Sequence, residues 1–200
     1  MLGQLPPGRA ITIREMAALL DVSPMPIREA LRQLAAEGAL EILENRRVMV
    51  PRMTAMKFSE LVDARVTLES HAAVQALPYI THDTLTQMRT LDRHIDAAEA
   101  EGNAENVMKL NQNFHRQLYT ANPYQVTMPL IESLWLQLAP FMRVAAAHLE
   151  EYYQVDRHLE AMSAIADKNP VALQLSIAAD IRDGCAFASS PEILQELLNV

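Results

Sequence analysis

Arginine side chains in the first quarter of the chain are spaced as in a helix that reads nucleic acid. In the run Asp21 to Leu40, DVSPMPIREALRQLAAEGAL, Arg28 and Arg32 are four residues apart and share one helix face. Such a helix needs side chains near its N-terminus that reach base edges, and cations that bind phosphate. Any single arginine could equally be ordinary solvated surface, but their joint arrangement favours DNA binding. The candidate DNA-binding residues are Arg14, Ser23, Met25, Arg28, Arg32, Arg46 and Arg47.

Two short helices with a tight turn between them must position these side chains. Thr12 predicts the N-cap of a helix from about residue 13 to residue 20. Ser23 predicts the cap of the second helix, with Pro24 at its first position, where a missing N–H costs nothing. Gly38 is expected to end that helix. This is the helix-turn-helix pattern.

A hairpin is expected directly after the second helix. Residues 41–43 and 48–50 are short strand-like runs, separated by four residues that include two arginines, and Pro51 ends the pattern. A helix-turn-helix followed by such a hairpin makes a winged helix. We therefore expect a DNA-binding domain over residues 1–52.

The rest of the chain, from Phe58 onward, is predicted to be helical. Five or six amphipathic helices with short connections favour an antiparallel bundle over residues 57–200, so the fold class is mainly α. The breaks are expected near Pro78, Gly102, Pro123, residues 150–153, Asn169–Pro170 and residues 189–191.

Charge is divided unevenly along the chain. The net charge is −8, but residues 1–52 hold seven arginines against six acidic residues, a net +1, whereas residues 53–200 carry −9. This division predicts an N-terminal module that contacts phosphate and a C-terminal body that does not.

The cysteine content indicates a reducing compartment. Cys185 is the single cysteine, which excludes an internal disulfide and a multi-thiolate zinc site. The sequence shows neither a secretory signal pattern nor an apolar run long enough to span a bilayer. We therefore expect a soluble, cytoplasmic protein.

A second set of polar residues lies in the predicted bundle. Asn111 and His115, in the run NQNFH, are four residues apart and project from the same helix face, while His158 and Asp180 fall on later helices. If no ligand is bound, these residues would satisfy one another in a cavity.

The run SPMPIREALRQLAAEGAL resembles the recognition helix of the GntR family of bacterial transcription regulators. The acidic helical remainder resembles the FCD ligand-binding domain of its FadR subfamily, so the resemblance covers essentially the whole chain. It implies a homodimer that binds a palindromic operator in double-stranded DNA, with no catalysis. It also implies that a small carboxylate metabolite in the C-terminal domain controls DNA affinity, and we expect a repressor.

The same resemblance implies a divalent metal site. Many FCD domains bind the metal through an Asp and a His at i, i+4 and two further His. Asn111 occupies the Asp position, His115 and His158 match directly, and Asp180 occupies the last His position. An amide oxygen is a weaker ligand than a carboxylate, and the His-to-Asp exchange favours oxygen-loving metals such as Mn²⁺ or Mg²⁺. The residues do not distinguish Zn, Mn, Mg and Ni.

Effector contacts are expected in the same domain. Arg65 matches an arginine that is common on the first FCD helix, and could form a bidentate pair with an effector carboxylate. Its alternative is an intrahelical pair with Glu69 at i+4. Arg143 and His148 share a predicted helix and could line the pocket.

Two departures from the family pattern bear on DNA binding. The family's winged helix normally begins with one more helix before the Pro-Pro-Gly turn at residues 6–8, and some members carry Arg where this chain has Pro24. Two rival functions stay open at this point. One is a small helical metal-dependent enzyme that uses the Asn/His/His/Asp cluster, and the other is an adaptor whose winged helix binds protein.

Overall fold

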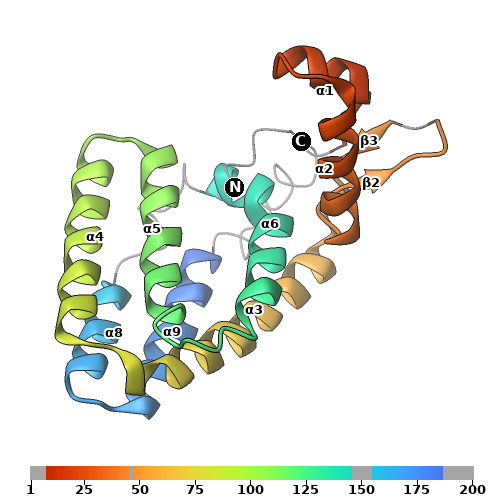
Figure 1. Ribbon diagram of the computed structural model, residues 1–200. Helices are drawn as coiled ribbons and strands as arrows, with labels where there is room; N and C mark the ends of the chain where they lie inside the picture. The colour runs from red at the N-terminus through yellow and green to blue at the C-terminus, as the bar shows by residue number, and fades with distance from the viewer. Residues whose placement is uncertain (1–7, 46, 146–154, 187–200) are drawn as a thin grey trace.

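The chain folds as a small helix-turn-helix module joined to a larger helical bundle (Figure 1). The computed structural model describes residues 8–45, 47–145 and 155–186, with side chains described up to residue 142 in the second range. The predicted mainly α fold, a winged helix followed by an all-α domain, is confirmed. Within the described residues, no helix is both long and apolar enough to cross a membrane.

The helix-turn-helix consists of α1 (Ile13–Leu19) and α2 (Pro24–Ala36). Thr12 caps α1 as predicted: its side chain accepts from the Glu15 N–H at 3.1 Å, and the Glu15 carboxylate accepts from the Thr12 N–H at 2.7 Å. Ser23 is the N-cap residue of α2, although its side chain makes no capping hydrogen bond, and Pro24 takes the first position. Gly38 follows the C-cap of α2 with φ +72°, the left-handed conformation that glycine adopts without strain.

The wing belongs to a three-stranded antiparallel sheet of order β1-β3-β2. The predicted hairpin is present as β2 (Glu41–Ile42) and β3 (Val48–Met49), in the register Glu41↔Met49 and Ile42↔Val48. The sequence analysis missed β1 (Ala10–Ile11), which pairs with the other edge of β3. A two-residue strand is too short to show an alternating pattern. The core of this module consists of Met16, Ala17, Ile27, Leu31, Leu40, Val48 and Val50.

The body is a helical bundle in which α3 packs against α9, α4 against α5, and α8 against α9. Most of the predicted breaks match the observed helix ends, and those at residues 150–153 and 189–191 lie outside the described residues. The elements are α3 (Ala55–Ala76), the 3-10 turn η1 (Leu77–Tyr79), α4 (His82–Ala100), α5 (Ala104–Tyr119), α6 (Met128–Ala145), α8 (Arg157–Ala166) and α9 (Pro170–Gly184).

Side-chain caps fix where the body helices begin. In five of them the N-cap side chain accepts a hydrogen bond from a backbone N–H of the first turn, which otherwise lacks a partner inside the helix. The cap residues are Thr54, Thr81, Asn103, Asp156 and Asn169. Between these helices lies an apolar core that includes the fully buried Met88, Phe114, Leu118, Ile131, Leu173 and Ile177.

The two modules touch where the end of α2 meets α6. The Ser133 hydroxyl donates to the Glu37 carbonyl oxygen at 3.1 Å. A Cβ atom built on Gly38 would lie 3.3 Å from the Gln137 side chain. Glycine therefore serves two needs here, because the position requires both a positive φ and a close approach to α6.

We predict that Gly38→Ala lowers the free energy of unfolding by about 1 kcal/mol or more, because alanine is strained at positive φ and crowds Gln137. Urea denaturation followed by circular dichroism measures this change. Gly184→Ala is the matched control, since an added Cβ there meets nothing within 4 Å. Equal stability of the two variants would contradict the prediction.

Candidate functional site

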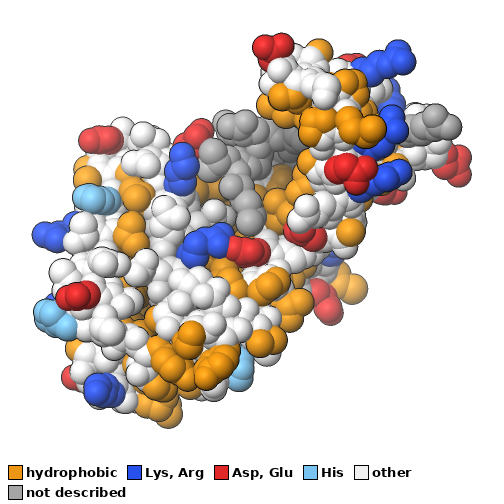
Figure 2. Space-filling model, in the orientation of Figure 1, with side chains coloured by type: hydrophobic (Ala, Val, Ile, Leu, Met, Phe, Trp, Pro, Cys, Tyr) orange, Lys and Arg blue, Asp and Glu red, His pale blue; other side chains and the backbone are white. Residues whose placement is uncertain are grey.

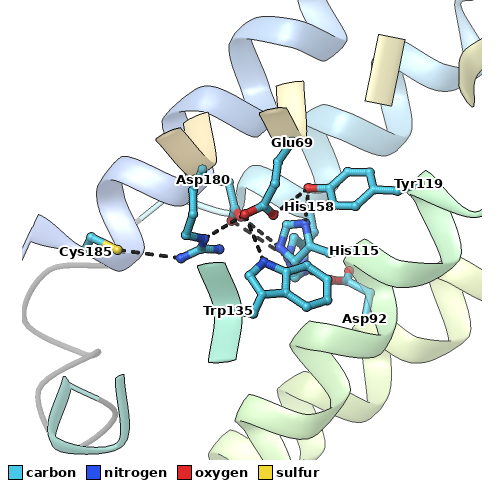
Figure 3. Close-up of polar contacts among 9 residues, drawn as sticks. Glu69, Asp92, His115, Tyr119, Trp135, His158, Asp180 and Cys185 are labelled. Carbon is cyan, nitrogen blue, oxygen red and sulfur yellow. Dashed lines mark hydrogen bonds and ion pairs between the residues drawn. The ribbon is translucent and has the colours of Figure 1, made fainter. Parts of the chain in front are cut away.

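Three of the four predicted metal ligands converge inside the bundle (Figure 3). His115 comes from α5, His158 from α8 and Asp180 from α9, and their ligand atoms all lie within 4.8 Å of one another. The Asp180 Oδ2 atom is 3.1 Å from His115 Nε2, and its Oδ1 atom is 3.8 Å from His158 Nε2. All three side chains are buried.

A buried carboxylate next to this cluster, that of Glu69, organises its surroundings. Glu69 is fully buried and accepts three hydrogen bonds: from Arg65 Nε at 2.7 Å, Trp135 Nε1 at 2.9 Å and the Tyr119 hydroxyl at 3.0 Å. Burial raises the pKa of Tyr119 well above its ordinary value, and the negative charges of Glu69 and Asp180 raise it further. Tyr119 therefore stays protonated, and its hydroxyl donates a hydrogen bond to Glu69.

This donation fixes the tautomer of His115. The Tyr119 oxygen lies 3.0 Å from His115 Nδ1. Because the hydrogen of this hydroxyl already points to Glu69, the oxygen can only accept a hydrogen bond from Nδ1. A neutral His115 therefore carries its hydrogen on Nδ1. Its Nε2 lone pair then faces the carboxylate of Asp180.

His158 is held in the same way by a residue that the sequence analysis missed. Its Nδ1 atom lies 2.8 Å from Oδ1 of Asp92, on α4. Burial alone would lower the pKa of His158, but the hydrogen bond to Asp92 and the charges of Asp180 and Asp92 raise it overall. No local sequence signal connects Asp92 to a histidine 66 positions later.

The cluster presents donor atoms of the kind that a metal cation needs. His115 Nε2 and His158 Nε2 are buried and have no hydrogen-bond partner among the described residues. Two nitrogen lone pairs aimed at one carboxylate repel it unless a proton or a metal lies between them. Metal-binding histidines are usually oriented in this way, with one ring nitrogen held by a neighbouring polar group and the other left available for the metal. The donor set therefore fits a divalent metal.

A cavity of about 320 Å³ opens beside the cluster. Asn111 and Arg65, a predicted metal ligand and a predicted effector contact, both line it. Asn111, the fourth predicted ligand, borders it together with His158 and Asp180. Arg65 also borders it, and the predicted alternative for this residue is observed, because Arg65 pairs with Glu69. Burial disfavours the Arg65 charge, yet the neighbouring Glu69 carboxylate raises the pKa of Arg65 overall. His148 and the Arg143 side chain lie outside the described residues.

Five of the predicted DNA-binding residues are exposed on the small module. Arg14, Ser23, Arg28 and Arg32 are exposed, and Met25 is 67% exposed. Figure 2 shows blue side chains gathered on this module, at the upper right of the molecule.

Two of the arginines make contacts within the module. Arg32 forms an exposed pair with Glu29 at 3.3 Å, which long side chains can exchange for phosphate at little cost. One guanidinium nitrogen of Arg47 donates to the Ala10 carbonyl at 2.8 Å, so Arg47 also ties the hairpin to β1. Arg46 lies outside the described residues.

Comparison with known proteins gives consistent matches to both modules. A profile of the FCD domain matches residues 60–183, and a profile of the bacterial regulatory proteins of the gntR family matches residues 1–50. The HTH-type transcriptional regulator McbR of Escherichia coli K12 is 26% identical over 84% of this chain and 78% of its own length. The Nta operon transcriptional regulator of Aminobacter aminovorans is 27% identical over 81% of this chain and 76% of its own length.

Solved structures show the same architecture. E. coli McbR/YncC superposes with a TM-score of 0.86 at 23% identity, covering 94% of this chain and 90% of that one. A putative transcriptional regulator GntR from Rhodococcus sp. RHA1 gives a TM-score of 0.73 at 26% identity, and the superposition covers 96% of this chain and 90% of that one. Together these findings define a DNA-binding transcriptional regulator and not an enzyme. The chain belongs to the GntR family, in the group whose C-terminal part is an FCD domain.

We predict that Glu69→Gln lowers the free energy of unfolding by about 3 kcal/mol, because it leaves the buried Arg65 charge uncompensated. Denaturation in urea measures the loss. Adding Arg65→Met to this variant should recover part of it, since the uncompensated charge is then removed. Glu29→Gln, which breaks the exposed pair with Arg32, is the control and should have no measurable effect.

Proposed function

We propose that this protein is a metabolite-responsive repressor that binds a palindromic operator as a homodimer. In this proposal, a divalent metal and a small carboxylate in the C-terminal domain control its DNA affinity. The observation that carries the proposal is the buried cluster of His115, His158 and Asp180, in which both Nε2 atoms face Asp180 without a hydrogen bond and His158 and Asp180 line a cavity. A repressor role is supported by the HTH-type transcriptional repressor RspR of E. coli K12, which is 22% identical over 88% of this chain.

The metal would be held by His115, His158 and Asp180, with Asn111 as a neutral oxygen donor. When bound, it would supply a fixed positive charge to which an effector carboxylate can bind. Asp92 and Tyr119 orient the two imidazoles from behind, and Arg65 places a guanidinium on the wall of the same cavity.

Hydrogen bonds support a coupling between this site and the DNA-reading module. Glu69, which orients Tyr119, also accepts from Trp135 on α6. Two residues earlier on α6, Ser133 donates to the carbonyl of Glu37 at the end of α2. A shift of α6 caused by ligand binding would therefore move the end of the recognition helix. In a dimer this changes the fit to the two half-sites, and DNA affinity falls.

The metal assignment predicts about one divalent ion per chain in the purified protein, measured by inductively coupled plasma mass spectrometry. Asp92→Asn should weaken metal affinity by roughly 10- to 100-fold, because it frees the His158 ring, and His115→Ala should abolish binding. Asn111→Asp should tighten binding by restoring a charged ligand.

The exposed His71→Ala is the control for this measurement. A wild-type protein that is substoichiometric in metal, and stays so when titrated with Mn²⁺, Zn²⁺ or Ni²⁺, would contradict the assignment.

If the protein recognises a DNA sequence, in vitro selection of genomic fragments that bind it should enrich one palindrome. Its affinity for that DNA should fall steeply as the salt concentration rises. Arg28→Ala should weaken binding by roughly 10-fold, because Arg28 is exposed near the N-terminus of α2, where a recognition helix reaches the bases. Fluorescence anisotropy with the enriched sequence measures the change.

Arg89→Ala removes an exposed arginine from α4 with the same change of net charge, and should leave DNA binding unaltered. If no sequence is enriched, or if both arginine variants bind DNA equally well, the DNA-reading proposal is wrong.

A further inference from the structure

Exposed apolar side chains gather at the lower end of the body, away from the reading module (Figure 2). Tyr79 lies in η1 and is 43% exposed. Tyr124 and Val126, in the connection between α5 and α6, are 74% and 81% exposed, and Leu130, in the first turn of α6, is 54% exposed. The rings of Tyr79 and Tyr124 pack edge to face with their centroids 6.4 Å apart, so the two segments form one surface. We call these four residues the tyrosine patch.

The backbone under the patch is held by local hydrogen bonds. The Tyr124 N–H donates to the side-chain oxygen of Asn122 at 3.0 Å, and the Met128 N–H donates to the Gln125 carbonyl at 3.2 Å. Exposed prolines, whose φ is fixed by the ring, stand next to the patch residues; they are Pro78, Pro123 and Pro129. A preorganised surface loses little conformational entropy when a partner covers it.

The two segments that form the patch carry no charged side chain. Lys, Arg, Asp and Glu make up 21% of the chain, yet none occurs in residues 70–82 or 117–131. Arg116 and Glu132, which flank the second segment, pair with each other. Charged residues are depleted and tyrosine is enriched at the centre of protein–protein interfaces. This composition therefore indicates a surface that contacts protein.

The exposed area is large enough for a specific contact. At these exposed fractions the four side chains present roughly 500 Å², taking about 200 Å² for each whole side chain. Exposed apolar patches of a few hundred Å² on a monomer commonly mark interaction sites. A symmetric contact would cover the patch on both copies, roughly 1,000 Å², and the exposed, uncharged Gln75 and Gln125 would add to the total. This approaches the area of about 1,200 Å² at which stable interfaces begin.

Charge identifies the partner as a second copy of the chain. The patch offers no charge to pair with nucleic acid or with an acidic or basic peptide. In a two-fold symmetric contact, residues near the axis face their own counterparts, so a charge there would meet a like charge. A charge-free patch avoids this repulsion, and it lets two chains of net charge −8 come into contact where neither is charged.

The position of the patch separates this contact from one that would bring two reading modules to the same operator. The connection between α5 and α6 lies at the lower end of the body, and the winged helix lies at the upper right (Figure 1). The helix α4, which runs along the body, has 19 residues and is about 28 Å long. Two copies joined at the patch would hold their reading modules more than about 50 Å apart, whereas half-sites one turn apart are about 34 Å apart.

We propose that the tyrosine patch binds the tyrosine patch of a second copy, in a contact distinct from the one that pairs the reading modules. The self-contact requires only the patch. Its consequence rests on the proposed function: two homodimers, each on its own operator, are joined into an assembly of four chains.

Sedimentation velocity of the full chain over a range of concentrations tests the self-contact. We expect four chains in the wild-type assembly and two in Tyr124→Glu, because the variant places like charges at the symmetric contact. Leu175→Glu is the matched control: it adds the same charge at a 64% exposed leucine of α9, outside the patch, and should keep the wild-type mass. A Tyr124→Glu variant that keeps the wild-type mass would overturn the proposal.

A variant of opposite charge separates recognition from loss of structure. Val126→Lys should also halve the mass, because each copy then carries a lysine at the contact. An equimolar mixture of Tyr124→Glu and Val126→Lys should recover the larger assembly, since unlike charges then face each other, and two misfolded variants could not do this. A mixture that stays at half the wild-type mass would count against the self-contact.

The same masses distinguish this proposal from the proposed homodimer. If the wild type contains two chains and Tyr124→Glu one, the self-contact holds and the separate reading homodimer is wrong. If the wild type contains two chains and no patch variant changes this, the homodimer stands and the self-contact is wrong. On DNA that carries two copies of the enriched sequence, Tyr124→Glu should bind each copy with wild-type affinity but lose cooperativity between them.

Discussion

The buried carboxylate of Glu69 is the group on which the rest of the body depends. It accepts hydrogen bonds from three donors on three different helices, α3, α5 and α6, and so satisfies a fully buried polar group. Its charge is balanced by Arg65, one helical turn away. Because the same carboxylate accepts the hydrogen of the Tyr119 hydroxyl, the Tyr119 oxygen accepts from His115 Nδ1, and His115 Nε2 is left to face the cluster. Helix packing and the protonation pattern of the site therefore have one common origin.

Features that depend only on neighbouring residues, such as the ends of helices, can be predicted from the sequence. The Thr12 cap, the first-turn proline of α2 and the glycine that ends it follow from backbone requirements that can be read within four or five residues. The spacing of Asn111 and His115 likewise places both on one helix face. That His158 and Asp180 join His115 came from a family resemblance, because no local rule relates residues on three helices.

The parts that sequence reasoning missed are all tertiary pairings. Asp92 becomes a partner of His158 only when α4 packs beside α8, and Tyr119 links Glu69 to His115 only when α3 packs against α5. In the small module, β1 exists only because β3 has a free edge for it. Each of these residues has an unremarkable local sequence context, so only the assembled fold shows its role.

The connection between the two modules is very short. Val50 is buried in the core of the winged helix and Met53 in the core of the body, so only Pro51 and Arg52 lie between two fixed points. Three extended peptide steps span roughly 10 Å. This short joint, together with the contact between the end of α2 and α6, keeps the reading module next to the bundle. In the dimer that we propose, the spacing between the two bound half-sites would therefore be set by the geometry of the body, tens of residues away from any base contact.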